Sequence, residues 1–175
     1  MPYHMTEQAI SYRKAVEKIG LLAKLGEFQV EIAGAAPLGL SVAHSDIDVL
    51  CFSSSPEPLE RAIWHEFGQE KNFSLRRWAA GEKAIIATFT AHGWTFQIYG
   101  SNVPVREQIG WKLYQAEIRL LALGGQHFKS EVMRLRSSGM KTIPAMMRVL
   151  GRDGDPYAAL IATGNVSDER LKADM

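Results

Sequence analysis

Residues 33–50 form the segment AGAAPLGLSVAHSDIDVL. The segment opens with a loop of small residues from Gly34 to Gly39 and ends in a run of alternating polar and apolar residues that begins at Asp46. Side chains of successive strand residues alternate between the two faces of a sheet. Asp46 and Asp48 are therefore predicted to lie on one face, and the apolar residues between and after them on the other.

A pair of neighbouring carboxylates is the part of this segment that can carry chemistry. Two acids on one face repel each other, and Mg²⁺ held by carboxylates and substrate phosphates relieves that repulsion. Gly34 precedes Asp46 by 12 residues, and a glycine turn after a strand lets backbone N–H groups approach a polyphosphate. An alternative remains for the acids, because Ser45 and Asp46 also suit a turn that leads into a strand.

Outward from this segment, hydrophobic periodicity predicts an α/β (α+β) fold. A helix is expected from Thr6 to about Leu25, followed by short strands and one helix up to Pro104. The expected strands cover residues 28–33, 46–52, 73–78, 83–90 and 94–99, with a helix at 57–67. These strands predict a mixed sheet of about five strands with flanking helices.

Beyond Pro104 the periodicity is helical almost to the end of the chain. The expected helices cover residues 105–123, 126–136, 143–150 and 156–162, and residues from Gly164 onward are expected to form a frayed polar tail. The sequence therefore predicts an α/β core at 1–104 and a helical C-terminal part at 105–175, packed on that core.

Composition limits the classes of function. The chain has 175 residues, 20 Lys and Arg against 19 Asp and Glu, and a formal net charge of +1. This balance argues against a broad nucleic-acid surface and leaves room for a local basic cleft. Cys51 is the single cysteine, no long apolar segment is present and none follows a basic start. A cytoplasmic protein with no membrane segment is expected.

Several motifs along the chain resemble those of a known group of proteins. They are Gly34 with Pro37-Leu38-Gly39, Ser45-Asp46-Ile47-Asp48, Phe96-Gln97-Ile98-Tyr99-Gly100, Glu117-Ile118-Arg119-Leu120-Leu121, Lys141-Thr142 with Pro144-Ala145, and Gly154-Asp155-Pro156-Tyr157. A small-residue turn followed by an acid-x-acid strand is similar to the signature of the polymerase-beta-like nucleotidyltransferase superfamily. The full set, over about residues 10–162, resembles a bacterial family of unknown function with a nucleotidyltransferase-like domain.

The resemblance implies a function. It implies that Asp46 and Asp48 are catalytic and hold Mg²⁺ or Mn²⁺, which bridges the phosphates of a nucleoside triphosphate. It also implies that Gly34, Ala35, Ser45 and Gln97 belong to the nucleotide-binding site. A nucleotidyl group would then pass to an acceptor, a small molecule or a protein, that the sequence does not identify.

Gln97 departs from the family pattern. The resemblance places a third acid at this position, and an amide cannot act as a base. The loss of a general base is typically worth about 10² to 10⁴ in rate, and Glu31 and Glu82 are candidates to replace it. Ala35 also departs from the pattern, because it offers a backbone N–H but no hydroxyl to a phosphate.

Other charged residues allow functional and structural interpretations. Arg76 and Arg77 are adjacent in a strand, so only one of them can face a cleft and hold a phosphate. Glu117 and Arg119 lie two apart on a helix and do not face each other. We expect these two to bridge the helical part and the core rather than to act in catalysis.

Three functional hypotheses remain open from the sequence. The first is a metal-dependent nucleotidyltransferase. The second is a catalytically impaired protein of the same fold that senses nucleotides or binds another protein, which the glutamine at position 97 motivates. The third is a metal-free scaffold in which Ser45 and Asp46 are turn residues only.

Overall fold

The structure is a computed structural model, and it describes residues 10–78 and 83–175. The chain divides into two compact units. The sheet unit contains the residues up to Pro37 and from Ala43 to Gln108, and the helical unit contains Leu38–Val42 together with Ile109–Met175.

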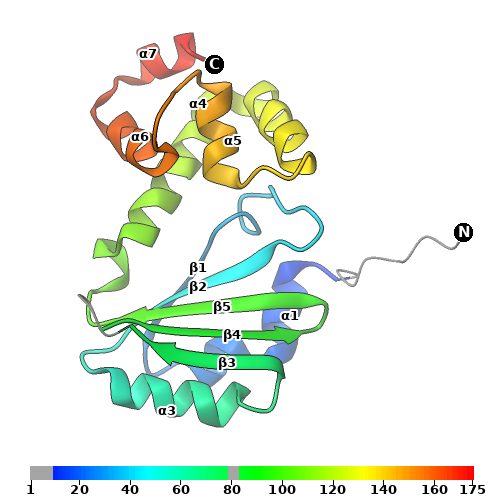
Figure 1. Cartoon of the computed structure of the whole chain (residues 1–175), viewed down its shortest axis with the longest axis vertical. Helices are drawn as coiled ribbons and strands as arrows, with labels where there is room; N and C mark the ends of the chain where they lie inside the picture. The colour runs from blue at the N-terminus through cyan, green and yellow to red at the C-terminus, as the bar shows by residue number, and fades with distance from the viewer. Residues whose placement is uncertain (1–9, 79–82) are drawn as a thin grey trace, which may run out of the picture. The chain divides into compact units, whose positions relative to one another are not determined.

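The sheet unit is built on five strands in the order β1-β2-β5-β4-β3 (Figure 1). Their bounds are Gln29–Ala33 for β1, Asp46–Phe52 for β2, Lys71–Arg77 for β3, Ile85–Ala91 for β4 and Trp94–Ser101 for β5. β2 and β5 run parallel, and the other neighbours are antiparallel. The mixed five-stranded sheet predicted from the sequence is confirmed. β4 and β5 form the expected hairpin, with positive φ at His92 and Gly93.

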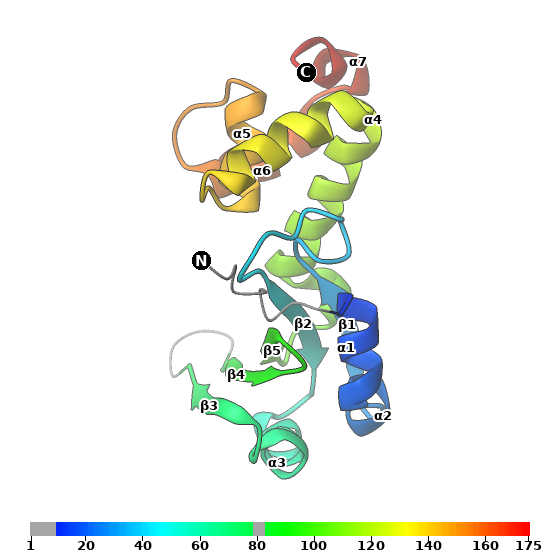
Figure 2. The ribbon, with the colours of Figure 1, turned by 90° about the vertical axis from the view of Figure 1, so that its right-hand side faces the viewer.

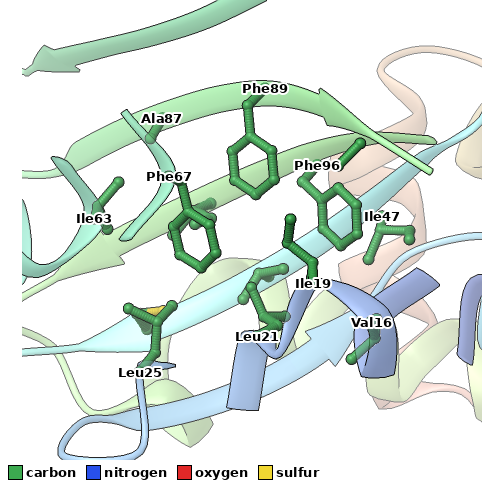
Figure 3. Close-up of a cluster of buried hydrophobic side chains, with 14 of the residues drawn as sticks. Val16, Ile19, Leu21, Leu25, Ile47, Ile63, Phe67, Ala87, Phe89 and Phe96 are labelled. Atoms are coloured by element: carbon green, nitrogen blue, oxygen red, sulfur yellow. The ribbon is translucent and has the colours of Figure 1, made fainter. Parts of the chain in front are cut away.

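One face of the sheet forms the hydrophobic core with α1, α2 and α3 (Figure 3). Alternate strand residues such as Ile47, Val49 and Ile98 are fully buried on this face. The ring of Phe89 lies between those of Phe67 and Phe96, at centroid distances of 4.8 and 5.0 Å. Because the apolar residues occupy one face, the intervening polar residues lie on the other.

The N-terminal helix is shorter than expected and is interrupted. α1 spans Tyr12–Ile19 and α2 spans Leu21–Lys24. Gly20 separates them, with a φ of 68°. Ser11 caps α1 by accepting a hydrogen bond from the Lys14 N–H, whereas the cap predicted at Thr6 lies outside the described residues. α3 spans Pro56–Phe67 and ends at Gly68, as the sequence predicted.

The helical unit is organised around α4, Ile109–Ser137, which follows the short 3₁₀ helix η1, Val105–Glu107 (Figure 2). Gly125 interrupts α4 with a φ of 58° and a ψ of −150°, close to the break expected between residues 123 and 126. α5 (Thr142–Val149), α6 (Pro156–Ala162) and α7 (Asp168–Ala173) contact α4. In the part of the chain that the structure describes, no helix combines the length and the apolar character needed to cross a membrane.

The end of the chain is not the frayed tail that its polar sequence predicted. A 3₁₀ helix, η2, covers Thr163–Asn165 and α7 follows it. Leu171 of α7 is fully buried. Arg119 donates hydrogen bonds to the carbonyl oxygens of Thr163 and Val166, at 2.8 Å each, and to Asp168. The partners of Arg119 in these contacts therefore belong to the helical unit, and the expected bridge to the core is wrong for this residue.

Candidate functional site

The polar face of the sheet carries both aspartates of residues 33–50. In the strand register, Asp48 of β2 lies between Ala33 of β1 and Gln97 of β5, and Asp46 lies beside Thr95. Paired residues of neighbouring strands share a face. Both aspartates are half-buried. They therefore lie on the same face of the sheet, at the start of β2 and on the side opposite the core.

Gly34 allows the backbone and the Asp48 carboxylate to approach each other. It follows β1 directly and has a φ of 81°, a conformation that glycine adopts without steric cost. A Cβ atom added to Gly34 would overlap the Asp48 carboxylate. The glycine turn and the acid pair predicted from the sequence are thus in contact, and Ala35 continues the turn. Ser45 is buried immediately before Asp46.

Gln97 lies on β5 directly beside Asp48, at the position where the resemblance implied a third acid. It is exposed and lies next to Asp48 in parallel register. Among the described residues, no three His, Cys, Asp or Glu side chains gather closely enough to hold a metal ion. Glu31 therefore does not complete a cluster with the two aspartates, and Glu82 lies outside the described residues. A metal ion here would depend on two carboxylates and on ligands from the substrate.

The donor set of this face fits a magnesium ion of that kind. Mg²⁺ takes oxygen ligands and is usually bound through one or two carboxylates together with substrate phosphates and water. Asp46 and Asp48 provide two carboxylates on one face, and Gly34 beside them has no side chain.

Two residues of the helical unit act on the far end of the glycine loop, and sequence reasoning missed both roles. A Cβ atom on Gly39 would lie 2.8 Å from Nζ of Lys129, so this ammonium group borders the loop. Arg136 donates hydrogen bonds to the carbonyl oxygens of Leu40 and Met140, at 3.2 Å each. Burial lowers the pKa of Arg136, and the nearby Glu117 carboxylate opposes that shift.

The adjacent arginines of β3 point to opposite faces. Arg77 binds Glu57 and Glu60 of α3, and its hydrogen bond with Glu60 raises the pKa of Arg77. Arg76 lies on the polar face, in the same row as Tyr99 of β5. Of the two, Arg76 is the one that faces the side of the sheet occupied by the aspartates.

Two further features lie away from the acid pair. A groove of about 620 Å³ separates α1 and α2 from the edge strand β1, and its lining includes Val16, Leu22 and Ile32 but neither aspartate. Cys51 is fully buried in the core, and burial raises the pKa of its thiol to about 12. This cysteine therefore remains protonated at ordinary pH.

Residues 14–163 match the model of a family described as "Domain of unknown function (DUF4269)". The chain belongs to the DUF4269 family. No curated protein matches it by sequence. The fold of this DUF4269 protein is similar to those of several solved structures.

A mutant Cid1 poly(U) polymerase bound to MgATP is similar over 85% of this chain and 46% of that chain, with a TM-score of 0.58 and 11% identity. A Cid1 structure described by its RNA terminal uridylyl transferase activity gives a TM-score of 0.57 at 14% identity, over 85% of this chain and 45% of that chain. The GLD-2/RNP-8 complex gives a TM-score of 0.52 at 13% identity, over 99% of this chain and 72% of that chain.

These neighbours are polymerase-beta-like nucleotidyltransferases, and this chain spans about half the length of the Cid1 structures. At such identities the similarity establishes the fold alone. The nucleotidyltransferase-like fold predicted from the sequence is confirmed.

Proposed function

We propose that this protein binds a nucleoside triphosphate together with Mg²⁺ or Mn²⁺ and transfers the nucleotidyl group to an acceptor hydroxyl. The observation that carries the proposal is the contact between the Gly34 turn and Asp48 on the face that also holds Asp46. Asp46 and Asp48 would hold the metal ion. When bound, the metal ion supplies positive charge against the negative charge that develops on the α-phosphate.

Each part of the chain then has a definite task. The small-residue turn from Gly34 offers backbone N–H groups to the triphosphate. The acceptor oxygen forms a bond to the α-phosphorus, the bond from that phosphorus to the bridging oxygen breaks, and pyrophosphate leaves. The hydroxyl proton passes to water or a substrate phosphate, because Gln97 cannot accept it.

A second candidate function rests on Gln97. Without a third carboxylate beside Asp48, the same face is suited to bind a metal–nucleotide complex and to transfer the nucleotidyl group slowly or not at all. In that case the protein is a nucleotide-sensing or protein-interaction module. Binding alone does not separate the two candidates, whereas pyrophosphate release does.

Calorimetric titration tests the proposal. ATP, GTP, CTP and UTP are titrated into the protein with MgCl₂, with MnCl₂ and with EDTA. We expect metal-dependent binding of at least one triphosphate. We expect Asp48→Asn to weaken that binding at least about tenfold, because a charge-assisted contact is worth roughly 1.5–3 kcal/mol.

Asp153→Asn is the matched control, because it removes one exposed carboxylate from a loop of the helical unit. Its binding should equal that of the unaltered protein. Binding that needs no metal ion, or that survives Asp48→Asn, would contradict the proposed site and favour the metal-free scaffold.

A further inference from the structure

The polar face of the sheet is segregated by charge from one edge to the other. Its acids are on β1 and β2, where Glu31 joins Asp46 and Asp48. The strands β5 and β4, between β2 and β3, present only neutral side chains on this face: Thr95, Gln97, Tyr99, Ser101, Ile86, Thr88 and Thr90. On β3, Arg76 pairs with Ile86, and Lys71, beyond a register shift that precedes Ser74, pairs with Thr90. By this pairing the edge of the face carries two cations.

The two cations are available to a ligand. Both side chains are exposed, and neither has a carboxylate within 4.0 Å among residues 10–78 and 83–175. Arg77, the neighbour of Arg76, differs in this respect, because it forms ion pairs with two glutamates of α3 on the other face. Arg76 and Lys71 therefore do not serve an ion pair with the described residues.

The neutral strands between the acids and the cations are rich in hydroxyl groups. Ser74 and Thr88 share a hydrogen bond of 2.9 Å between their hydroxyls. Asn72 donates to the Thr90 hydroxyl at 3.4 Å. Each hydroxyl is both a donor and an acceptor with two lone pairs, so capacity for further hydrogen bonds remains. A polyhydroxylated molecule suits such a surface.

We propose that the acceptor is an anionic, phosphate-bearing molecule, bound with its reactive hydroxyl at Asp46 and Asp48 and its phosphate against Lys71 and Arg76. The proposal rests on the proposed function and names its acceptor class. Three strand spacings separate β2 from β3, about 14 Å, so the phosphate lies well away from the hydroxyl. Arginine binds phosphate through paired hydrogen bonds. A polycationic amino sugar would meet no carboxylate on β3, β4 or β5 of this face, as far as the described residues extend.

Fluorescence anisotropy with labelled probes tests the acceptor class in the presence of Mg²⁺ and a non-hydrolysable triphosphate analogue. The phosphate-bearing probes are a short single-stranded oligoribonucleotide and a nucleoside 5′-monophosphate, which distinguish a polymer from a small molecule. The cationic probe is an aminoglycoside. We expect at least one phosphate-bearing probe to bind and the aminoglycoside not to bind.

The variant carrying Lys71→Ala and Arg76→Ala should weaken binding of that probe at least about tenfold, in line with the loss of two charge-assisted contacts. Arg76→Lys should retain part of the affinity because it keeps the charge. The control variant, Lys18→Ala with Arg61→Ala, removes two exposed cations from α1 and α3 and should bind the probe normally.

Triphosphate binding, measured by calorimetry on the same variants, separates the two proposals. It should be unchanged in the variant lacking Lys71 and Arg76. Absence of triphosphate binding would overturn the proposed function. If triphosphate binding is intact, any one of three results would overturn the acceptor class. These are that neither phosphate-bearing probe binds, that the aminoglycoside binds better, or that loss of both cations leaves probe affinity unchanged.

Discussion

At the scale of single residues, the contact between Gly34 and Asp48 determines where one carboxylate of the candidate site lies. The positive φ of Gly34 and the overlap of any Cβ atom with the carboxylate act together. An alanine there would adopt a left-handed conformation at about 1–2 kcal/mol. It would also displace the Asp48 side chain.

Gly34→Ala should therefore weaken metal-dependent triphosphate binding at least about tenfold, as measured by calorimetry, in addition to its cost in stability. Gly151→Ala is the matched control, because Gly151 has a φ of 62° and an added Cβ atom there would meet no described atom within 4 Å. It carries the backbone strain without the overlap. Equal triphosphate affinity in the two variants would show that the Asp48 position does not matter for binding.

Gln97 is the residue at which gain of function can be tested. Gln97→Glu would place a third carboxylate one strand spacing from Asp48. We expect higher affinity for Mg²⁺ or Mn²⁺, and faster pyrophosphate release if a missing base limits turnover, by up to about 10² to 10⁴. Thr88→Glu adds the same charge in the same row, one strand further away. A metal affinity that falls or stays constant in Gln97→Glu would contradict this account of the position.

The local relations among these residues were predictable, and the distant ones were not. The two-residue period of a strand is sufficient to place Asp46 and Asp48 on one face. Lys129 and Arg136 meet Gly39 and Leu40 across about ninety residues of chain. No periodicity encodes such a contact, because it depends on how the helices pack.

At the scale of elements, the C-terminal segment shows how one buried side chain can decide structure. Residues 164–175 are mostly polar, so their sequence resembles a solvated tail. Ser167 nevertheless caps α7, and Leu171 is fully buried. Arg119 adds hydrogen bonds to the backbone just before this helix. Composition misses the helix because its stability comes from one apolar anchor and contacts made elsewhere in the chain.

Leu171→Ala should lower the free energy of unfolding by about 2–5 kcal/mol, the usual cost of truncating a fully buried leucine. Urea denaturation followed by circular dichroism measures the change. Lys172→Ala, at an exposed position of the same helix, should stay within about 0.5 kcal/mol of the unaltered protein. Similar small effects from both substitutions would mean that α7 contributes little to the fold.

At the scale of the whole molecule, the sequence predicted the number of strands better than their arrangement. Turns and alternation reveal strands one at a time, and the hairpin of β4 and β5 follows from its short turn. The parallel pairing of β2 with β5 joins segments separated by about forty residues. The membership of Leu38–Val42 in the helical unit is equally non-local. Both features depend on the packing of segments that are distant in the sequence, and no short stretch of sequence encodes them.

The inclusion of Leu38–Val42 in the helical unit also has a consequence for biosynthesis. Leu40 is fully buried, and its carbonyl oxygen is bound by Arg136, yet the ribosome makes Leu40 long before Arg136. A nascent chain that stops short of α4 has the acid pair but lacks the partners that fix the far end of the glycine loop. The far end of the loop therefore gains its partners only after Arg136 of α4 has been synthesised.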